Sequence, residues 1–291
     1  MRRMARLTDR GSTAGSEPSA SAPSELLASQ TRVIRSGKGS APRPSEEDVV
    51  IDLRERPPSV ERRDDPLRPL VGKVAVVTGG GGPAGRAVAL ALLEAGARVC
   101  VLDANATELR ATTSAAVASA PILYLQCDLG SVTEVAGAAD FIARFDRPVD
   151  VLVHAADVHV THDVSTGVVA DLDEQYLVNL RGPYLITQHL VTQLREGPGH
   201  IVFVRPWSSE INADDTQYAM THAGVGALAE GLRDELGAAG VRISTIHVGL
   251  PGPGLAPVEP VDIADCVMGA LEMPARVELS NLQLRPRSAT A

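Results

Sequence analysis

The sequence predicts an α/β fold: a doubly wound parallel sheet of about seven strands in a single domain over residues 69–291. Apolar, β-branched runs alternate with helix-like segments from Lys73 onward. The runs are separated by about 10 to 28 residues, which is long enough for crossover helices between parallel strands. Finally, the stretch Val74–Asp103 has the order strand, glycine turn, helix, strand. These features together favour one open, mostly parallel sheet covered on both faces.

The stretch Val74–Asp103 also indicates a ligand. VAVVT is followed by the glycine cluster GGGGPAG, an Ala- and Leu-rich helix and the strand RVCVLD, which ends on Asp103. Glycines let a backbone approach a pyrophosphate, and the helix start offers unpaired N–H groups, so this order is typical of a dinucleotide-binding unit. The carboxylate of Asp103 suits the ribose hydroxyls and would repel a 2′-phosphate, which favours NAD over NADP. A glycine-rich turn without a ligand is the alternative.

The remaining elements follow from periodicity and turn residues. Further strands are expected at residues 122–128, 149–156, 200–206, 241–249 and 277–286. Helices are expected at residues 132–145, 168–196, 216–240 and 261–272. The second of these helices is long and carries an irregularity at Gly182-Pro183, and the third closes on Gly240.

Composition sets limits on the rest of the chain. Residues 1–68 are rich in Ser, Ala, Pro, Arg and Glu and are expected to form a disordered tail, either regulatory or an overlong start. The chain has a net charge of −9, which argues against a general nucleic-acid or anionic-membrane binder. No apolar run is long enough to span a membrane. The three cysteines show neither metal spacing nor a disulfide framework, so a cytoplasmic location is expected.

With these motifs in hand, the chain resembles the short-chain dehydrogenase/reductase family over about residues 73–286. The resemblance is carried, in family order, by VVTGGGGPAG, Asp103, the CDL of residues 127–129, DVLVHAA, VNLRGPYLITQ, the helix of Tyr218 and GVRISTIHVG. It implies a Rossmann-like fold, a nicotinamide cofactor and hydride transfer between an alcohol and a ketone. It also implies a small-molecule substrate and a homodimer or homotetramer formed through the two long helices.

The resemblance assigns the cofactor-binding residues one by one. They are Thr78, Gly79, Gly80, Gly82, Gly85, Asp103, Asp128, Leu129, Ala155 and His222. Asp128 matches the family acid that contacts the adenine amine. Two departures stand out: Pro83 replaces the middle glycine of the family's TGxxxGxG, with the four-glycine run expected to shift the turn by one residue, and the family's NNAG is His154-Ala155-Ala156-Asp157 here.

The catalytic residues are matched only in part. Tyr218 corresponds to the family acid/base, and Asn179 to the asparagine of its proton relay. A tyrosine needs a neighbouring cation to work near neutral pH. The family supplies a lysine four residues on, where this chain has His222, and no lysine follows Lys73. His222 is therefore the expected substitute, with a weaker effect on Tyr218.

The family serine that polarises the substrate carbonyl is also displaced. Arg205 and Pro206 stand where two serines usually lie, so Ser208 or Ser209 is expected to serve through a bulge. Arg205 either stabilises an oxyanion or, as is commoner for an arginine at a strand end, reaches solvent. The segment after the sixth strand is too short for the family's helical lid.

Alternatives of function and site remain open at this point. The expected function is an NAD(P)-dependent oxidoreductase with low or specialised activity, with NAD favoured as the cofactor. The alternative is a catalytically inactive dinucleotide-binding protein with a regulatory role, including a hetero-oligomer with an active paralogue. A lyase or epimerase on the same fold is more distant. A metal site is conceivable from a cluster of polar residues after the fourth strand, but its spacing fits no standard motif and no metal is predicted. The cluster comprises His154, Asp157, His159, His162 and Asp163.

Overall fold

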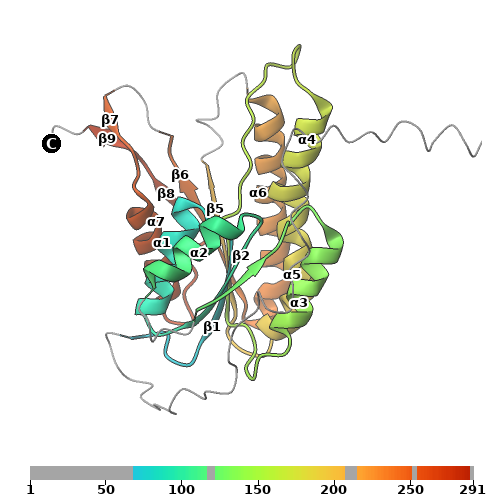
Figure 1. Cartoon of the computed structure of the whole chain (residues 1–291). Helices are drawn as coiled ribbons and strands as arrows, with labels where there is room; N and C mark the ends of the chain where they lie inside the picture. Colours follow the sequence, from blue (N-terminus) through green and yellow to red (C-terminus); the bar gives the residue numbers. More distant parts are fainter. Residues whose placement is uncertain (1–67, 117–121, 207–214, 251–253, 289–291) are drawn as a thin grey trace, which may run out of the picture. The chain divides into compact units, whose positions relative to one another are not determined.

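The computed structural model describes residues 68–116, 122–206, 215–250 and 254–288. The expected tail lies outside these residues except for Arg68. The main sheet has seven strands in the order β3-β2-β1-β4-β5-β6-β8, and every neighbouring pair is parallel. The doubly wound α/β fold is thus confirmed (Figure 1).

The strands agree with the expected ranges, and several are shorter. Their bounds are β1 (Val74–Thr78), β2 (Arg98–Asp103), β3 (Ile122–Gln126), β4 (Val151–His154), β5 (His200–Pro206), β6 (Arg242–Val248) and β8 (Asn281–Leu284). The largest difference is in β8, which was expected from residue 277. Among the described strands it is an edge strand whose neighbour is β6, and its length is that of the four residues that pair with β6.

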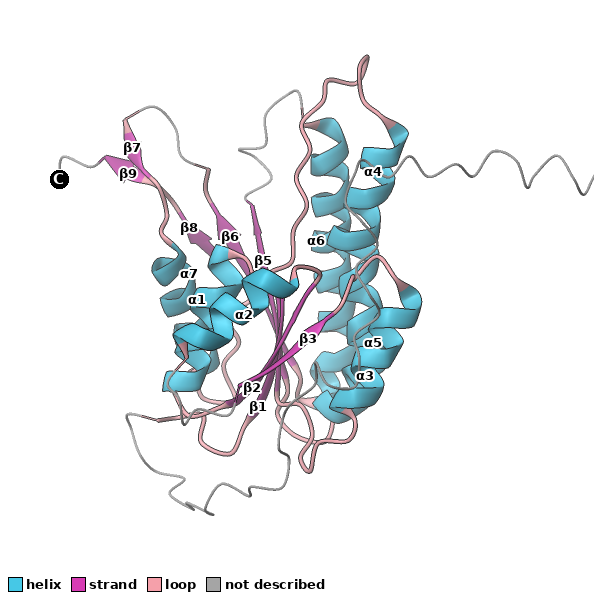
Figure 2. Cartoon of the chain, in the orientation of Figure 1, coloured by secondary structure: helices cyan, strands magenta, loops and turns pink. Residues whose placement is uncertain are grey.

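Helices cover both faces of the sheet (Figures 1 and 2). One face carries α1 (Pro83–Glu94), α2 (Ala106–Ala115) and α7 (Pro260–Leu271). The other carries α3 (Val132–Ile142), α4 (Val169–Gln175), α5 (Gly182–Leu194) and α6 (Thr216–Leu236). The helix α2 was not among the expected elements, because its Thr-rich sequence has little apolar periodicity. The side chain of Asn105 caps it by accepting hydrogen bonds from the backbone N–H groups of Thr107 and Glu108.

The irregularity in the long helix lies just before its expected position. A π-helical segment, Tyr176–Arg181, separates α4 from α5, and Gly182-Pro183 begins α5. Pro183 has no N–H and its ring crowds the carbonyl four residues earlier, that of Asn179, which widens the preceding turn. The helical segment that begins with α6 ends at Gly240, as expected, and Gly240 has a φ of 81°.

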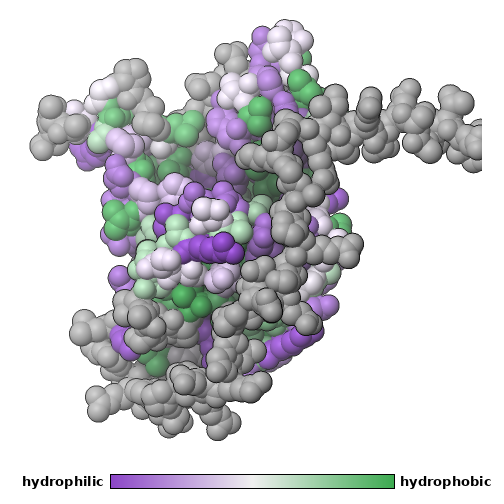
Figure 3. All heavy atoms as spheres, viewed as in Figure 1, coloured by the Kyte–Doolittle hydropathy of each residue, from purple (hydrophilic) through white to green (hydrophobic). Residues whose placement is uncertain are grey.

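The hydrophobic core lies between the sheet and its helices. All five residues of β1 are buried, and α1 packs on α7 across the same face. Figure 3 shows hydrophilic and hydrophobic side chains intermixed on the described surface over α1 and α2. A small antiparallel pair of strands, β7 (Leu255–Ala256) and β9 (Arg287–Ser288), was not predicted from the sequence. Among the described helices, none is long and apolar enough to cross a membrane.

Candidate functional site

At two positions of the glycine turn between β1 and α1, a side chain would strike backbone atoms. Gly79 has a φ of +69°, and a Cβ there would lie 2.5 Å from the backbone of Ala156. A Cβ on Gly85 would lie 2.2 Å from the carbonyl oxygen of Gly79. Both residues must therefore be glycine for the turn to fold back under the start of α1.

The start of α1 is suited to an anion. Gly82 is the N-cap residue and provides no side-chain cap, and Pro83 occupies the first turn. Proline is tolerated there because its N–H would have no helical partner, and its fixed φ suits the helix. The backbone N–H of Gly82 donates to the carbonyl oxygen of Gly79 at 3.0 Å, which closes the turn. Pro83 thus fits the cradle, although it removes one possible phosphate donor.

A cleft of about 470 Å³ runs along the carboxyl ends of β1, β2, β3 and β4. This is the point where the strand order reverses, which is the usual ligand position in open α/β sheets. Seven of the expected cofactor residues line it: Gly79, Gly82, Gly85, Asp103, Asp128, Leu129 and Ala155. Thr78 and Gly80 lie behind this lining, where Thr78 is fully buried and a Cβ on Gly80 would meet Val101 at 2.7 Å.

Asp103 fastens the glycine turn to the end of β2. Its Oδ2 accepts a hydrogen bond from the backbone N–H of Gly81 at 3.0 Å, and its Oδ1 accepts one from Asn105 at 2.9 Å. Asp128, after β3, accepts a hydrogen bond from the backbone N–H of Gly130 at 2.8 Å. Two more carboxylates, Asp157 and Glu174, line the same cleft, and no lysine or arginine does so. The described cleft is therefore acidic.

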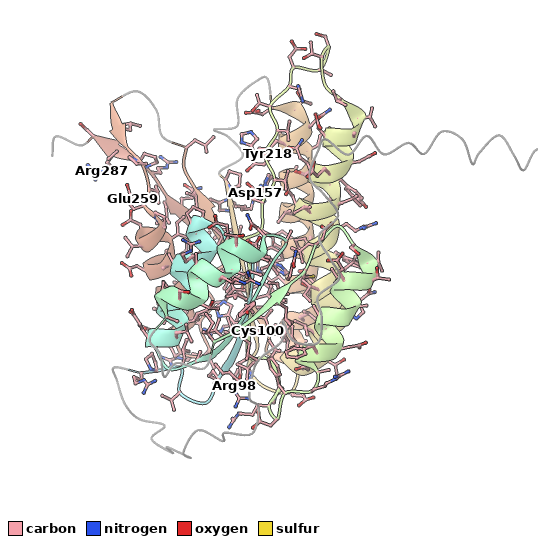
Figure 4. The ribbon with its side chains drawn as sticks, in the orientation of Figure 1. Arg98, Cys100, Asp157, Tyr218, Glu259 and Arg287 are labelled. Atoms are coloured by element: carbon pink, nitrogen blue, oxygen red, sulfur yellow. The ribbon has the colours of Figure 1, made fainter. Side chains whose placement is uncertain are left out.

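Tyr218 meets an unexpected partner at the other end of this cleft. Its hydroxyl donates a hydrogen bond to Oδ2 of Asp157 at 2.5 Å, and Nε2 of His222 donates to Oδ1 of the same carboxylate at 3.1 Å. Figure 4 shows Tyr218 and Asp157 next to one another above the strands. Asp157 therefore bridges the two α6 residues that were assigned catalytic roles, one turn apart. The role of Asp157 was not recognised from the sequence, although its position after β4 was noted.

Asn179 holds Asp157 in place through the neighbouring residue. Its Oδ1 accepts from the backbone N–H of Val158 at 2.7 Å, and its Nδ2 donates to the carbonyl oxygen of Val158 at 2.8 Å. Asn179 lies in the π-helical segment and is 2% exposed. Its amide is thus paired on both sides with the loop after β4, so its contribution here is to fix that loop beside Tyr218.

Tyr218 lies in a dry environment that opposes ionisation. It is 4% exposed, and the ring of His159 stacks on it with centroids 4.0 Å apart. Burial raises the pKa of Tyr218, and the charge of Asp157 together with its hydrogen bond raises this pKa further. A lysine beside the tyrosine would lower this pKa, because its positive charge stabilises the phenolate. The phenol is therefore held in its protonated form.

Arg205 corrects the expectation that it reaches solvent. It is 6% exposed and lies against α6, where its Nη1 would be 2.6 Å from a Cβ on Gly226. Gly226 leaves the space that the guanidinium fills. Within the described residues, Nε of Arg205 has no hydrogen-bond partner, and burial lowers the pKa of the group. Its charge acts on Tyr218 and lowers the pKa of that phenol, but this effect is smaller than those of burial and Asp157.

The polar cluster after β4 separates into pairs. His154 points into the core, where its Nε2 lies 3.0 Å from Oγ1 of Thr187. His159 pairs with Asp215 at 3.3 Å, and His162 pairs with Asp171 at 2.8 Å. Among the described residues, no group of three or more His, Cys, Asp or Glu side chains is placed to hold a metal ion.

The expected carbonyl-polarising residues, Ser208 and Ser209, lie outside the described residues. So does part of the segment after β6, at residues 251–253. The described residues thus form a glycine turn suited to a dinucleotide at β1–α1. The cleft extends from this turn to Asp157, the partner of the buried Tyr218.

Comparison with known proteins places this geometry among relatives. The sequence model of the family described as short chain dehydrogenase matches residues 73–255. An uncharacterized oxidoreductase of Staphylococcus aureus strain MW2 is 26% identical over 228 residues, covering 75% of this chain and 98% of the relative. One of Staphylococcus saprophyticus is also 26% identical, with coverage of 74% and 97%. A crystal structure of a metagenomic short-chain oxidoreductase in complex with NADP has a TM-score of 0.69 and 30% identity, covering 75% of this chain and 98% of that one.

Proposed function

This chain belongs to the short-chain dehydrogenase family, and from that premise we propose that it is an NAD-dependent oxidoreductase with low turnover that interconverts an alcohol and a ketone. The observation that carries the proposal is the single cleft that joins the glycine cradle at Gly79 and Gly85 to Asp157, the partner of Tyr218. A dinucleotide is long enough to lie along this cleft, with its phosphates at the glycine turn and its nicotinamide toward Asp157.

The residues of the cleft fit this cofactor. The turn that excludes a Cβ at Gly79 and Gly85, followed by a helix start without a side-chain cap, suits a pyrophosphate. Asp103 lines the cleft at the end of β2, where its carboxylate favours ribose hydroxyls and opposes a 2′-phosphate. When bound, the cofactor supplies the acceptor or donor of the hydride. NAD is therefore the proposed cofactor, although the metagenomic relative was solved with NADP.

The proposed roles of the protein residues follow their positions. Tyr218 exchanges the proton with the substrate oxygen, His222 and Asn179 hold the groups around it, and Ser208 or Ser209 polarises the carbonyl. The low expected turnover follows from the environment of Tyr218, because a phenol held protonated by burial and by Asp157 is a poor base on its own.

The second candidate is a dinucleotide-binding protein that no longer catalyses and acts as a regulatory partner. It is favoured by one observation, that the hydroxyl of Tyr218 donates to Asp157 while no lysine lies on α6 to lower its pKa. Both candidates share the cofactor cleft. Only turnover separates them.

The experiment therefore measures binding and turnover on the same preparation. NADH and NADPH are titrated by fluorescence, and a panel of alcohols and ketones is assayed from about pH 6 to 10. We expect NADH to bind more tightly than NADPH, and turnover to be lost in Tyr218→Phe. NADH binding without turnover would overturn the oxidoreductase. If a His222→Lys, Pro206→Ser variant then gains activity from none, the second candidate is supported.

We also propose a homodimer or homotetramer formed through the two long helical segments, with a hetero-oligomer as the variant of the regulatory candidate. Three large side chains on these segments are exposed: Tyr176 by 46%, Tyr184 by 49% and Met220 by 57%. A cytoplasmic location fits the free, buried thiols of Cys100 and Cys127. Light scattering on the purified chain measures the oligomeric state directly.

A further inference from the structure

Two hydrogen bonds hold the carboxylate of Asp157, and two more hold the residue that follows it in the loop. Two are made directly, from the hydroxyl of Tyr218 and from Nε2 of His222. Two more, between Asn179 and the backbone of Val158, fix the next residue of the loop. The side chain of Asp157 is still 36% exposed, whereas that of His222 is 4% exposed. One oxygen of this carboxylate thus faces a buried phenol while the group remains open to the cleft.

We propose that Asp157 is the proton acceptor behind Tyr218, so that the site works through a tyrosine–carboxylate pair in place of a tyrosine beside a lysine. This inference rests on the proposed function and adds a residue to it. A lysine helps a tyrosine by stabilising the phenolate. A carboxylate helps in a different way, because it takes the phenol proton at the moment when the phenol oxygen takes the proton of the substrate.

The step balances as follows for oxidation of an alcohol. The C–H bond of the carbinol breaks, and a bound oxidised dinucleotide would supply the acceptor for its hydride. The alcohol O–H bond breaks, and its proton forms a new O–H bond with the oxygen of Tyr218. The original O–H bond of Tyr218 breaks, and that proton forms an O–H bond with Oδ2 of Asp157. The exposed side of the carboxyl group then releases the proton to water, and reduction of a ketone runs the same transfers backwards.

The charged groups around Tyr218 are consistent with a proton relay from Tyr218 to Asp157. Asp157 and His159, from the loop after β4, face Tyr218. Asp215 and His222 face it from the first turns of α6, and the guanidinium of Arg205 faces it from β5. Two carboxylates near one buried phenol disfavour a free phenolate. They do not disfavour a transfer in which the phenol never carries a net charge. The relay therefore makes use of the environment that weakens the ordinary mechanism.

The first test needs no substrate and compares Asp157→Asn with Asp163→Asn. Both residues are in the loop after β4, but among the described residues the carboxylate of Asp163 accepts hydrogen bonds only from Ser165 and Thr166 of that loop. Tyrosine labelled with carbon-13 at Cζ reports the hydrogen bond of the Tyr218 hydroxyl, and the resonance is assigned with Tyr218→Phe. At neutral pH we expect the Cζ resonance of Tyr218 to move in Asp157→Asn, because the charged acceptor of its O–H is lost, and to stay at its wild-type position in Asp163→Asn. An unchanged Cζ resonance in Asp157→Asn would show that the pair does not exist.

The second test is turnover. We expect Asp157→Asn to lower kcat by about 100-fold or more, with KM and the Kd of NADH within about twofold of wild type, since a general base typically contributes 10²- to 10⁴-fold. Turnover that survives in Asp157→Asn removes the relay and leaves the oxidoreductase. Higher turnover in Asp157→Gly also removes it and identifies Asp157 as a block. A wild-type protein that binds NADH and turns nothing over removes both proposals together.

Discussion

At the scale of single residues, the site depends on which polar side chains lose contact with water. Arg205 and Tyr218 are both more than nine-tenths buried, whereas Asp157 stays partly open to the cleft. Burial disfavours the charged form of each group, so the phenol keeps its proton and the guanidinium pKa falls. Of these three groups, the partly exposed carboxylate of Asp157 is the one best able to exchange a proton with water.

Two buried histidines lead to a prediction about pH. Burial lowers the pKa of His154 and of His200 to about 3. In the unfolded chain both titrate near 6.5, so the unfolded state takes up protons first and stability falls as the pH drops below about 6.5. Each group costs about 2 kcal/mol between neutral pH and pH 5. Urea unfolding at pH 7.5 and at pH 5 measures the loss, which we expect to shrink by about 2 kcal/mol in His154→Asn.

The control for this prediction is His189→Asn. His189 is exposed on α5, so its removal is expected to leave the acid-dependent loss of stability as it is in the wild type. An equal loss in wild type and His154→Asn would mean that His154 is protonated in the folded protein, contrary to its burial.

At the scale of elements, the turn from β1 into α1 separates glycines that are required from one that is not. A Cβ on Gly85 would strike the carbonyl oxygen of Gly79 at 2.2 Å, while a Cβ on Gly82 would meet that oxygen at an ordinary 3.4 Å. Gly82 also has an extended backbone that any residue adopts. The glycines of this turn are thus not equivalent, and the sequence GGGGPAG does not by itself say which of them the turn requires.

We expect Gly85→Ala to destabilise the protein by about 1–3 kcal/mol, because backbone atoms must move to admit the methyl group, and to abolish NADH binding. Gly82→Ala is the matched control and is expected to cost only a few tenths of a kcal/mol to about 1 kcal/mol, as for an N-cap glycine replaced by alanine. Thermal unfolding and NADH titration of the two variants measure the contrast. Equal loss of binding in both would show that the cradle does not depend on this close approach.

Sequence reasoning succeeded for elements with strong periodicity and failed where partners are distant in the chain. The strands around β1 and β4 follow from apolar runs alone. The pair Tyr218–Asp157 joins residues 61 positions apart and depends on where a loop is fastened by Asn179, which no local pattern encodes. The burial of Arg205 depends on the missing side chain of Gly226, so a glycine within a long helix was the available signal. The helix α2 lacked a signal because its interior is polar.

At the scale of the whole molecule, charge is unevenly placed. Residues 1–68 hold 13 basic and 11 acidic side chains, whereas residues 69–291 hold 14 basic and 25 acidic ones. Within the cleft the imbalance is sharper, because Asp103, Asp128, Asp157 and Glu174 line it without a described lysine or arginine. Arg86 lies near the glycine turn, but Glu108 pairs with it at 2.7 Å. An anionic cofactor therefore enters a negative field.

This field predicts an unusual dependence on salt. Formal charges of the same sign repel over a distance that shrinks from about 30 Å at 0.01 M salt to about 10 Å at 0.1 M, so added salt weakens the repulsion between the cleft and the dinucleotide. We expect the Kd of NADH to fall a few-fold between about 0.02 and 0.2 M sodium chloride. NADPH carries a further phosphate toward Asp103 and is expected to show a steeper gain. Adenosine, which is uncharged, is the control ligand and should bind equally at both concentrations. Asp128→Asn removes one of the charges that line the cleft and should reduce the salt dependence of the Kd of NADH. If the affinity of the wild-type protein for NADH falls as salt rises, the helix start of α1, rather than the carboxylates, dominates the field in the cleft.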